Sequence, residues 1–224
     1  MRIAPSKVSY NAAISACSKG GQWQLALSLL SSMPDMKIFP DEISDSAAIG
    51  ACERGGQWQL ALSLLRSMSV MRVIPNQISY SAAISASEKG GHWQLALSLL
   101  SSMPGMRIAR DTISYSAAIS ACEKGGQWQL ALSILSSMIG MKIVPDEISF
   151  NAAIRACEKA GQWQLALSLL SSMPGMRLTP DVLTYSSAMG ACEKGGQWQL
   201  AVSLLSGIPD PLLAARKESN GSWR

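Results

Sequence analysis

The sequence predicts an all-α protein, a right-handed superhelical solenoid built from stacked helix-turn-helix hairpins. Tryptophan recurs with a constant spacing of 35 residues, at Trp23, Trp58, Trp93, Trp128, Trp163 and Trp198. Nearly the same block surrounds each tryptophan, GGQWQLALSLLSSM in its first occurrence, and a second block such as ISYSAAISACEKGG precedes it. Apolar residues within both blocks are spaced as on a helix. A fixed period of this length is typical of a repeat protein.

The repeat accounts for almost the whole chain. Six copies are expected, at residues 7–41, 42–76, 77–111, 112–146, 147–181 and a degenerate 182–216. Residues 1–6 resemble the tail of an incomplete copy, and residues 217–224 form a tail. Because Met1 is in register with Met36 and its equivalents, we expect the chain to be a fragment of a longer array.

One copy is predicted to fold as two helices. Tyr10, Ile14 and Cys17 are spaced i, i+4, i+7 and so lie on one face of a first helix. Gly20 and Gly21 follow, and glycine favours the positive backbone dihedrals that end a helix. This pair of glycines predicts a tight turn between the two helices.

The second helix carries apolar residues on more than one side. Trp23, Ala26 and Leu30 form one stripe, while Leu29 lies on another flank. Pro34 is expected to end this helix, because proline cannot continue an interior helical hydrogen-bond pattern. A hairpin of this size cannot bury these faces alone, so successive copies are expected to stack.

Composition excludes several classes of protein. The chain has 224 residues, of which 48% are hydrophobic, and no apolar run approaches the length of a membrane helix. A formal charge of +4 permits a nucleic-acid partner without requiring one. The one histidine, His92, has no catalytic partner near it and is expected to be a solvated turn residue. We therefore predict no enzyme activity and no cofactor or metal.

The cysteines follow the same period and are not expected to form disulfides. Cys17, Cys52, Cys122, Cys157 and Cys192 lie in successive copies. Residues in successive copies do not converge on one point. We interpret them as small buried residues of a protein in a reducing, intracellular compartment.

The repeat resembles a known family. A unit of 35 residues that opens like VSYNAAISACSKGG and closes with an apolar residue, proline and aspartate is similar to the pentatricopeptide repeat. Tetratricopeptide repeats are the nearest alternative, but they have a period of 34 and an early tryptophan in the first helix. Here the tryptophan opens the second helix instead.

The resemblance implies binding of single-stranded RNA, with one base recognised by each repeat. In the family, the residue after the first-helix aromatic and the last residue of the repeat contact the Watson–Crick edge. The corresponding residues, called here the base-recognition residues, are Asn11, Asp41, Ser46, Asn76, Ser81, Asp111, Ser116, Asp146, Asn151, Asp181 and Ser186.

The family's pairings imply a target sequence. They associate uracil with the pairs Asn11–Asp41 and Asn151–Asp181, adenine with Ser46–Asn76, and guanine with Ser81–Asp111 and Ser116–Asp146. Because family members bind RNA parallel to the chain, the expected core target is 5′-UAGGU-3′. Ser186 lacks a partner, since Arg216 in the closing position fits no pattern. An alternative role for these residues is ordinary helix capping, because Asp, Asn and Ser are common caps.

Two further rows of equivalent residues accompany the base-recognition residues. One is aliphatic, and in the family such residues sandwich the bases: Val8, Ile43, Ile78, Ile113, Ile148 and Leu183. They could equally be core residues. The other is cationic: Lys19, Arg54, Lys89, Lys124, Lys159 and Lys194. These could contact phosphates or simply complement the helix dipole, and we expect the neighbouring glutamates to point elsewhere.

The aromatic rings are interpreted as packing residues. Trp23 and its equivalents lie on the second helix and are expected to pack repeat against repeat rather than stack on bases. Tyr10, Tyr80, Tyr115, Phe150 and Tyr185 are expected to pack in the same way. Asp45 occupies this position in the second copy, which makes that copy the weakest.

Two functional classes remain. The chain is either an RNA adaptor with a role in RNA processing, stability or translation, or a protein-protein interaction scaffold of tetratricopeptide-like type. The resemblance implies a chloroplast or mitochondrion, although no targeting peptide is visible. Self-association through uncapped solenoid ends is expected, including the second-helix face around and after residue 206.

Overall fold

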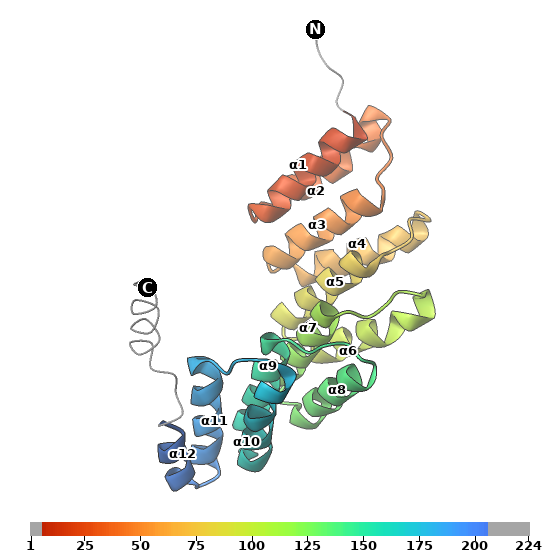
Figure 1. Ribbon diagram of the computed structural model, residues 1–224. Coiled ribbons are helices and arrows are strands. Elements are labelled where there is room, and N and C mark those ends of the chain that lie inside the picture. The colour runs from red at the N-terminus through yellow and green to blue at the C-terminus, as the bar shows by residue number, and fades with distance from the viewer. Residues whose placement is uncertain (1–5, 206–224) are drawn as a thin grey trace, which may run out of the picture. The chain divides into compact units, whose positions relative to one another are not determined.

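The computed structural model describes residues 6–205, which form pairs of antiparallel helices (Figure 1). The chain divides into two compact units, Met1–Gly125 and Gly126–Arg224. The first contains α1 (Lys7–Lys19), α2 (Trp23–Ser32), α3 (Glu42–Arg54), α4 (Trp58–Val70), α5 (Gln77–Lys89), α6 (Trp93–Ser102) and α7 (Thr112–Lys124). The second contains α8 (Trp128–Gly140), α9 (Glu147–Lys159), α10 (Trp163–Ser172), α11 (Val182–Lys194) and α12 (Trp198–Leu205). Three short 3-10 helices follow second helices, η1 (Pro34–Met36), η2 (Pro104–Met106) and η3 (Pro174–Met176).

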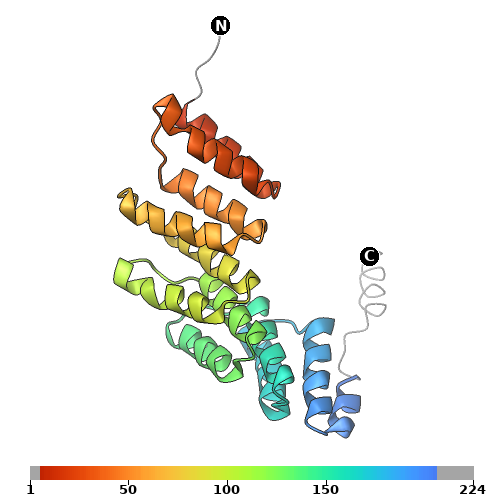
Figure 2. The same ribbon diagram turned by 180° about the vertical axis from the view of Figure 1, so that it is seen from behind.

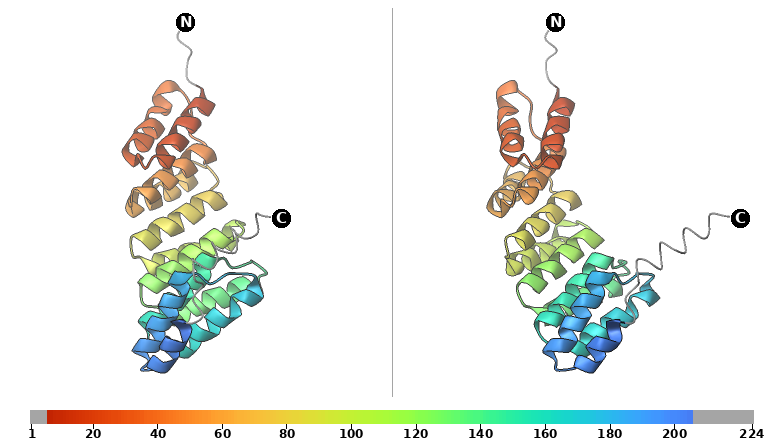
Figure 3. Two further views of the ribbon diagram at one scale, coloured as in Figure 1. Left: turned by 60° about the vertical axis from the view of Figure 1, so that its left-hand side comes forward. Right: turned by 90° about the vertical axis from the view of Figure 1, so that its left-hand side faces the viewer.

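Within each unit the helices stack as predicted. In the first unit, α1, α3, α5 and α7 pack side by side, and each second helix packs against its own first helix and the next one. In the second unit, α9 and α11 pack together in the same way, with α10 against both (Figures 2 and 3). Each unit is therefore an all-helical stack of helix pairs. None of the described helices is both long enough and apolar enough to cross a membrane.

Each first helix begins at the residue where a copy was expected to start. The residue before it is an extended N-cap whose side-chain oxygen accepts a hydrogen bond from a backbone N–H of the first turn. These N-caps are Ser6, Asp41, Asn76, Asp111, Asp146 and Asp181. The helix-capping role that the sequence offered as an alternative for the aspartates and Asn76 is therefore present in the structure. Residues 1–5 of the tail assigned to 1–6, the tail 217–224 and residues 206–216 of the sixth copy lie outside the described residues.

The two glycines of the turn have different functions. Gly56 and its equivalents have a positive φ, 68° at Gly56. Gly55, by contrast, has a φ of −78°, so the prediction of two positive dihedrals was wrong for the first glycine. A methyl group at Gly55 would collide with the ring of Trp23 from the preceding repeat. The first glycine therefore makes room for a tryptophan, which confirms packing of repeat against repeat for Trp23, Trp58, Trp93 and Trp163. In the fifth copy Ala160 stands in place of this glycine, and Trp198 is exposed.

Proline decides where the second helices end. Where it follows the second helix, as at Pro34 and Pro104, the helix is 10 residues long and a 3-10 turn comes next. Where serine or isoleucine replaces it, α4 and α8 extend to 13 residues. The missing N–H of proline explains the difference.

Asp45 is the unusual residue of the core. It occupies the position of the buried aromatic residues Tyr80, Tyr115 and Phe150, and its exposed fraction is 0%. Neither carboxylate oxygen has a hydrogen-bond partner. Burial, with a smaller contribution from the charge of Asp41, raises the pKa of Asp45 to about 6. Because the folded chain binds this proton more tightly than the unfolded chain does, ionised Asp45 destabilises the folded state by about 3 kcal/mol at neutral pH.

Replacing Asp45 is expected to stabilise the protein. In the folded chain Asp45 keeps its proton to about pH 6, whereas in the unfolded chain it releases it near the ordinary value of 3.8. Wild-type stability should therefore fall as pH rises through this interval, relative to Asp45→Asn. Urea unfolding at several pH values should show Asp45→Asn more stable by about 1–3 kcal/mol at neutral pH, with the difference vanishing in acid. Asp45→Tyr, which restores the residue of the other copies, should be at least as stable. Equal pH profiles for wild type and Asp45→Asn would contradict this account.

Gly56→Ala tests the positive φ of the turn. The left-handed conformation costs a non-glycine residue roughly 1–2 kcal/mol, so urea unfolding should show a loss of that size. Gly105→Ala is the matched control, because a Cβ at Gly105 meets nothing within 4 Å and its φ is not positive. The control should change stability by less than about 0.5 kcal/mol. An equal loss for both variants would show that the backbone conformation is not the cause.

Candidate nucleic-acid interface

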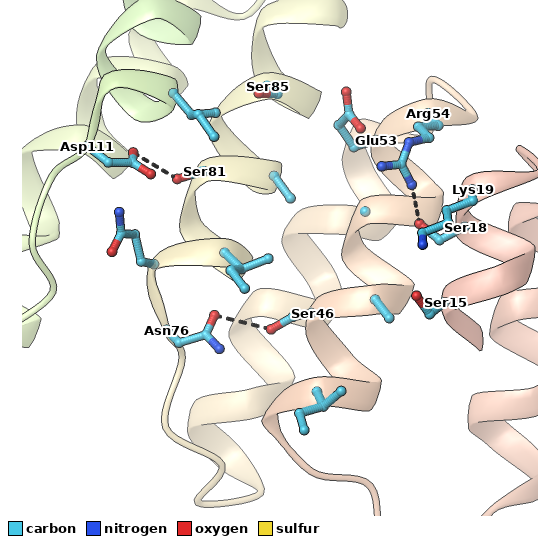
Figure 4. A pocket seen from close by; sticks show the side chains of 17 residues that line it. Ser15, Ser18, Lys19, Ser46, Glu53, Arg54, Asn76, Ser81, Ser85 and Asp111 are labelled. Atoms are coloured by element: carbon cyan, nitrogen blue, oxygen red, sulfur yellow. Dashed lines mark hydrogen bonds between the residues drawn. The ribbon is translucent and has the colours of Figure 1, made fainter. Parts of the chain in front are cut away.

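The first helices of the N-terminal unit line a groove of about 750 Å³ (Figure 4). Its walls come from α1, α3, α5 and α7 and from the N-caps of α5 and α7. The base-recognition residues Ser46, Asn76, Ser81 and Asp111 line it, together with three aliphatic residues, Ile43, Ile78 and Ile113. Lys19 and Arg54 of the cationic row line it as well, so residues of all three rows singled out in the sequence meet on one surface.

In this unit the structure brings together base-recognition residues that are 30 positions apart. Asn11 donates a hydrogen bond through Nδ2 to Asp41 Oδ1 at 3.1 Å. Ser46 Oγ donates to Asn76 Oδ1, and Ser81 Oγ donates to Asp111 Oδ1, each at 3.3 Å (Figure 4). Each pair joins a first helix to the N-cap of the next one.

The remaining base-recognition residues make the following contacts. In the second unit, Thr184 Oγ1 lies between Asn151 Oδ1 and Asp181 Oδ1, at 2.7 Å from each. Ser116 donates to the carbonyl of Thr112, and Asp146 caps α9. Ser186 lines a hollow beside α12, and Arg216 lies outside the described residues.

In the N-caps Asn76 and Asp41, one side-chain atom accepts the hydrogen bond that caps the helix, and the second side-chain atom takes no part in the cap. Asn76 Oδ1 accepts from the backbone N–H of Ser79 and from Ser46 Oγ, so this oxygen is fully engaged. Among the described residues, Asn76 Nδ2 has no hydrogen-bond partner. Asp41 likewise uses Oδ1 for the cap, while Oδ2 lies 3.6 Å from Lys7 Nζ. Capping and base recognition are therefore compatible roles for the same side chain.

Three of these aspartates have a lowered pKa. Burial opposes ionisation of Asp41, but hydrogen bonds from Ser44 and Asn11 and the charge of Lys7 outweigh it and lower its pKa. Burial also opposes ionisation of Asp111, and hydrogen bonds from Ser114, Gln77 and Ser81 outweigh it.

Asp181 has its pKa lowered mainly by hydrogen bonds from Thr184. All three side chains are thus held as carboxylates, which accept hydrogen bonds and do not donate them.

The aliphatic row lies on the surface. Ile78 has an exposed fraction of 67%, and Val8, Ile43, Ile113, Ile148 and Leu183 are exposed as well. The alternative that these are core residues is wrong for the described chain. Exposed aliphatic side chains beside the base-recognition pairs fit a role in contacting a ligand, which stays a prediction.

The cationic row is largely paired. Lys89 Nζ lies 2.5 Å from Glu53 Oε1, and Lys124 and Lys194 pair in the same way with Glu88 and Glu158. Each pair links consecutive repeats, so the expectation that the glutamates point elsewhere was wrong. Arg54 donates to Ser18 Oγ, where the first copy lacks the glutamate. Phosphate contacts by the paired lysines would have to compete with these ion pairs.

A second cationic row escaped the sequence analysis. Lys37, Arg72, Arg107, Lys142 and Arg177 follow the second helices, are exposed, and have φ between 58° and 61°. Left-handed backbone is uncommon for residues other than glycine. Their period of 35 was visible in the sequence, but no amphipathic pattern drew attention to them. They do not line the groove.

The described residues contain no cluster of His, Cys, Asp and Glu that could hold a metal ion. The five cysteines are free thiols, and burial raises the pKa of Cys52, Cys122 and Cys157 to about 11. Such thiols are poor nucleophiles at neutral pH. His92 contacts the ring of Trp58, with centroids 3.9 Å apart, and is half-buried rather than solvated as expected.

Comparison with known families identifies the class of protein. The PPR repeat family matches residues 5–54 and 145–194, the pentatricopeptide repeat domain matches 98–159, and a further PPR repeat matches 78–108. The chain belongs to the pentatricopeptide repeat family. No curated protein matches it.

Solved structures of this family share the fold. The pentatricopeptide repeat protein PPR10 from maize superposes with a TM-score of 0.68 at 23% identity, over 93% of this chain and 31% of that one. PPR10 in complex with an 18-nt psaJ RNA element gives 0.72 at 22% identity, over 93% and 30%.

The PPR domain of Arabidopsis thaliana protein-only RNase P 1, in complex with tRNA, gives 0.70 at 15% identity, over 81% and 96%. This chain thus spans about a third of the length of PPR10. At these identities the likeness shows the fold.

Asn76→Ala and Asn76→Asp separate the structural role of an N-cap from its chemistry. Alanine removes the cap of α5, so urea unfolding should show a loss of about 1 kcal/mol. Aspartate keeps an acceptor oxygen toward Ser79 and should change stability by less than about 0.5 kcal/mol. A large loss with Asp would show that Nδ2 has a structural role, and no loss with Ala would show that the cap contributes little.

Proposed function

We propose that this chain binds single-stranded RNA in a sequence-specific manner, with one base facing each repeat and 5′-UAGGU-3′ as core target. The observation that carries the proposal is the hydrogen-bonded pairing of base-recognition residues across consecutive first helices, on the wall of a groove. Pairs such as Ser46–Asn76 combine a fixed cap with a side-chain atom that differs between copies.

The geometry of the N-cap explains how a repeat could distinguish one RNA base from another. Any N-cap must present one acceptor to the helix, and both Asp and Asn do so. The second atom is then an acceptor in Asp111 and an amide donor in Asn76. The guanine Watson–Crick edge offers N–H donors suited to a carboxylate, whereas adenine N1 accepts and suits an amide. The lowered pKa of Asp41 and Asp111 keeps them as acceptors at neutral pH.

The aliphatic row supports the same proposal. Ile43, Ile78 and Ile113 are exposed, line the groove and recur once per repeat. An unstacked base loses its contacts with neighbouring bases, and an apolar side chain on each side replaces part of them. One aliphatic residue per repeat gives one such contact per base.

The chain would act by binding rather than by catalysis. The residues that line the groove include no histidine or cysteine, and its carboxylates Glu53 and Asp111 are engaged in an ion pair and in hydrogen bonds. We therefore propose a role as an adaptor in RNA processing, stability or translation, in a chloroplast or mitochondrion. A protein-protein scaffold remains the competing function that the experiment must separate.

The test is a change of base preference in two variants whose substitutions lie in the groove. Wild type should prefer UAGGU over UGGGU and UAUGU by roughly tenfold or more at fixed moderate salt. Asn76→Asp exchanges a donor for an acceptor, so it should come to prefer UGGGU. Ser81→Asn reproduces the Asn11–Asp41 pair in the third repeat and should come to prefer UAUGU. Fluorescence anisotropy with labelled oligonucleotides measures all nine affinities.

Ser85→Asn is the matched control, since Ser85 lines the same groove without belonging to a base-recognition pair. It should leave the order of preference unchanged. Equal binding of the three RNAs by wild type, or preferences that ignore the variants, would contradict base recognition. Absence of RNA binding throughout would favour the scaffold.

A further inference from the structure

We propose that one edge of the repeats binds the surface of an anionic lipid bilayer, as a peripheral contact in which no helix crosses the membrane. The edge, called here the loop edge, consists of the last turns of α4 and α8 and of the segments that connect each second helix to the next first helix. These segments are residues 33–40, 71–75 and 103–110 in the first unit, and 141–145 and 173–180 in the second. They do not line the groove, so the inference does not depend on RNA binding.

A basic residue occupies the same left-handed position in every connecting segment. These residues have φ between 58° and 61°, and they are Lys37, Arg72, Arg107, Lys142 and Arg177. Glycine adopts this conformation without steric cost, whereas a residue with a Cβ does not. A charge near the end of the second helix gains less from the helix dipole than this conformation costs. The backbone thus favours glycine at a position where all five copies have a cation.

The charge of this row is not neutralised within the described part of the chain. The five side chains are exposed and form no ion pair with another described residue. Lys89, at the other end of the helix pairs, is by contrast paired with Glu53. The connecting segments of the second to fifth copies contain no acidic residue, and that of the first copy contains Asp35. The loop edge therefore carries positive charge.

Apolar side chains are exposed beside these cations. Phe39 and Ile74, each two residues after a basic residue, both have an exposed fraction of 76%, and Val70 has 83%. In the second unit Ile139 and Val144 are exposed as well. The methionine directly before the basic residue is exposed in four copies: Met36, Met71, Met106 and Met141. Apolar side chains that recur in this way on one edge are typical of an interaction surface.

The loop edge lies at one end of the helix pairs. Each second helix ends there and the next first helix begins there, whereas the glycine turns lie at the opposite end. A first helix of 13 residues separates the two ends by about 20 Å. In the first unit the connecting segments lie together on one side, at the right in Figure 1 and at the left in Figure 2. One flat partner can therefore reach several of them.

The combination of cations and protruding apolar side chains favours a bilayer as the partner. Lysine and arginine attract anionic head groups, and apolar side chains enter the boundary between head groups and acyl chains. An RNA backbone would neutralise the cations, but it offers little apolar surface to Phe39, Val70 and Ile74. A folded protein would need a surface shaped to these side chains, whereas a fluid layer adapts to them. Weak contacts from several repeats then add up on one surface.

Co-sedimentation of the full chain with lipid vesicles, without RNA, tests the proposal. Wild type should bind vesicles of phosphatidylcholine mixed with phosphatidylglycerol, and should bind phosphatidylcholine alone far more weakly. Added potassium chloride should weaken binding, because it screens the charges. Circular dichroism checks that every variant is folded.

Two double variants test the basic row. Lys37→Gln with Arg72→Gln should weaken binding to anionic vesicles by on the order of 25-fold, because each cation near such a surface contributes about fivefold. Lys37→Gly with Arg72→Gly should weaken it as much and resist urea at least as well as wild type, because glycine relieves the left-handed backbone. Asp35→Asn should strengthen binding, because it removes a negative charge from the loop edge.

Lys19→Gln with Arg54→Gln is the matched control for charge. It removes the same charge from the same two repeats at the opposite end of the first helices, about 20 Å away and so beyond the Debye length of about 10 Å at 0.1 M salt. This variant should bind anionic vesicles nearly as wild type does.

The apolar side chains have a separate test. Phe39→Ser with Ile74→Ser should weaken binding by on the order of tenfold and leave its dependence on salt unchanged, because no charge is altered. Leu25→Ser is the control, since Leu25 is exposed in the first turn of α2, at the glycine-turn end. It should bind like wild type.

Several results would overturn the proposal. Absence of binding to anionic vesicles, or equal binding to neutral ones, would exclude the bilayer as partner. An equal loss in the Lys19 and Arg54 variant would indicate general attraction of a cationic protein rather than a defined edge. An affinity for single-stranded RNA that falls as much as vesicle binding in Lys37→Gln with Arg72→Gln would mean that the loop edge contacts nucleic acid instead.

Discussion

The packing of a tryptophan ring on a glycine of the next repeat is the contact on which the remaining structure depends. One helix pair cannot bury both of its apolar faces, so it needs a neighbour in a fixed position. The ring of Trp23 fits only where Gly55 has no side chain, and this sets how closely α2 approaches the end of α3. The same contact recurs 35 residues apart at Gly90 and Gly125, and again at Gly195, whereas Ala160 stands at this position in the fifth copy. The rows of equivalent residues follow from that regularity.

The N-cap couples this framework to the groove. Each first helix needs an acceptor before its first turn. At Asp41, Asn76 and Asp111 the residue that supplies this acceptor also forms a hydrogen bond with the preceding first helix. Stability constrains one atom of the side chain and leaves the other unconstrained. A repeat can therefore change between Asp and Asn without losing its cap. This separation allows a chain of nearly identical repeats to carry different chemistry in each.

Departures from the repeat have local physical costs. Asp45 places a carboxylate without partners where the other copies bury an aromatic ring, and its raised pKa records the penalty. The lysine-glutamate pairs, in contrast, join consecutive repeats and neutralise much of the row that the sequence offered for phosphate contacts. The left-handed basic residues after the second helices are exposed and form no such ion pair with another described residue.

The sequence by itself determined the repeat, its two helices and the positions where they begin, because period, glycine pairs and caps are local signals. Through the family resemblance it also predicted which residues recognise bases, and that role stays a prediction. Only the tertiary structure decided which side-chain atoms form contacts between neighbouring repeats. Examples are the hydrogen bond between Ser46 and Asn76 and the ion pair between Lys89 and Glu53. The exposure of Ile78 likewise depends on how neighbouring repeats pack. Local patterns fix the helices, but the distance and orientation between residues 30 to 36 positions apart arise from packing of one repeat on the next.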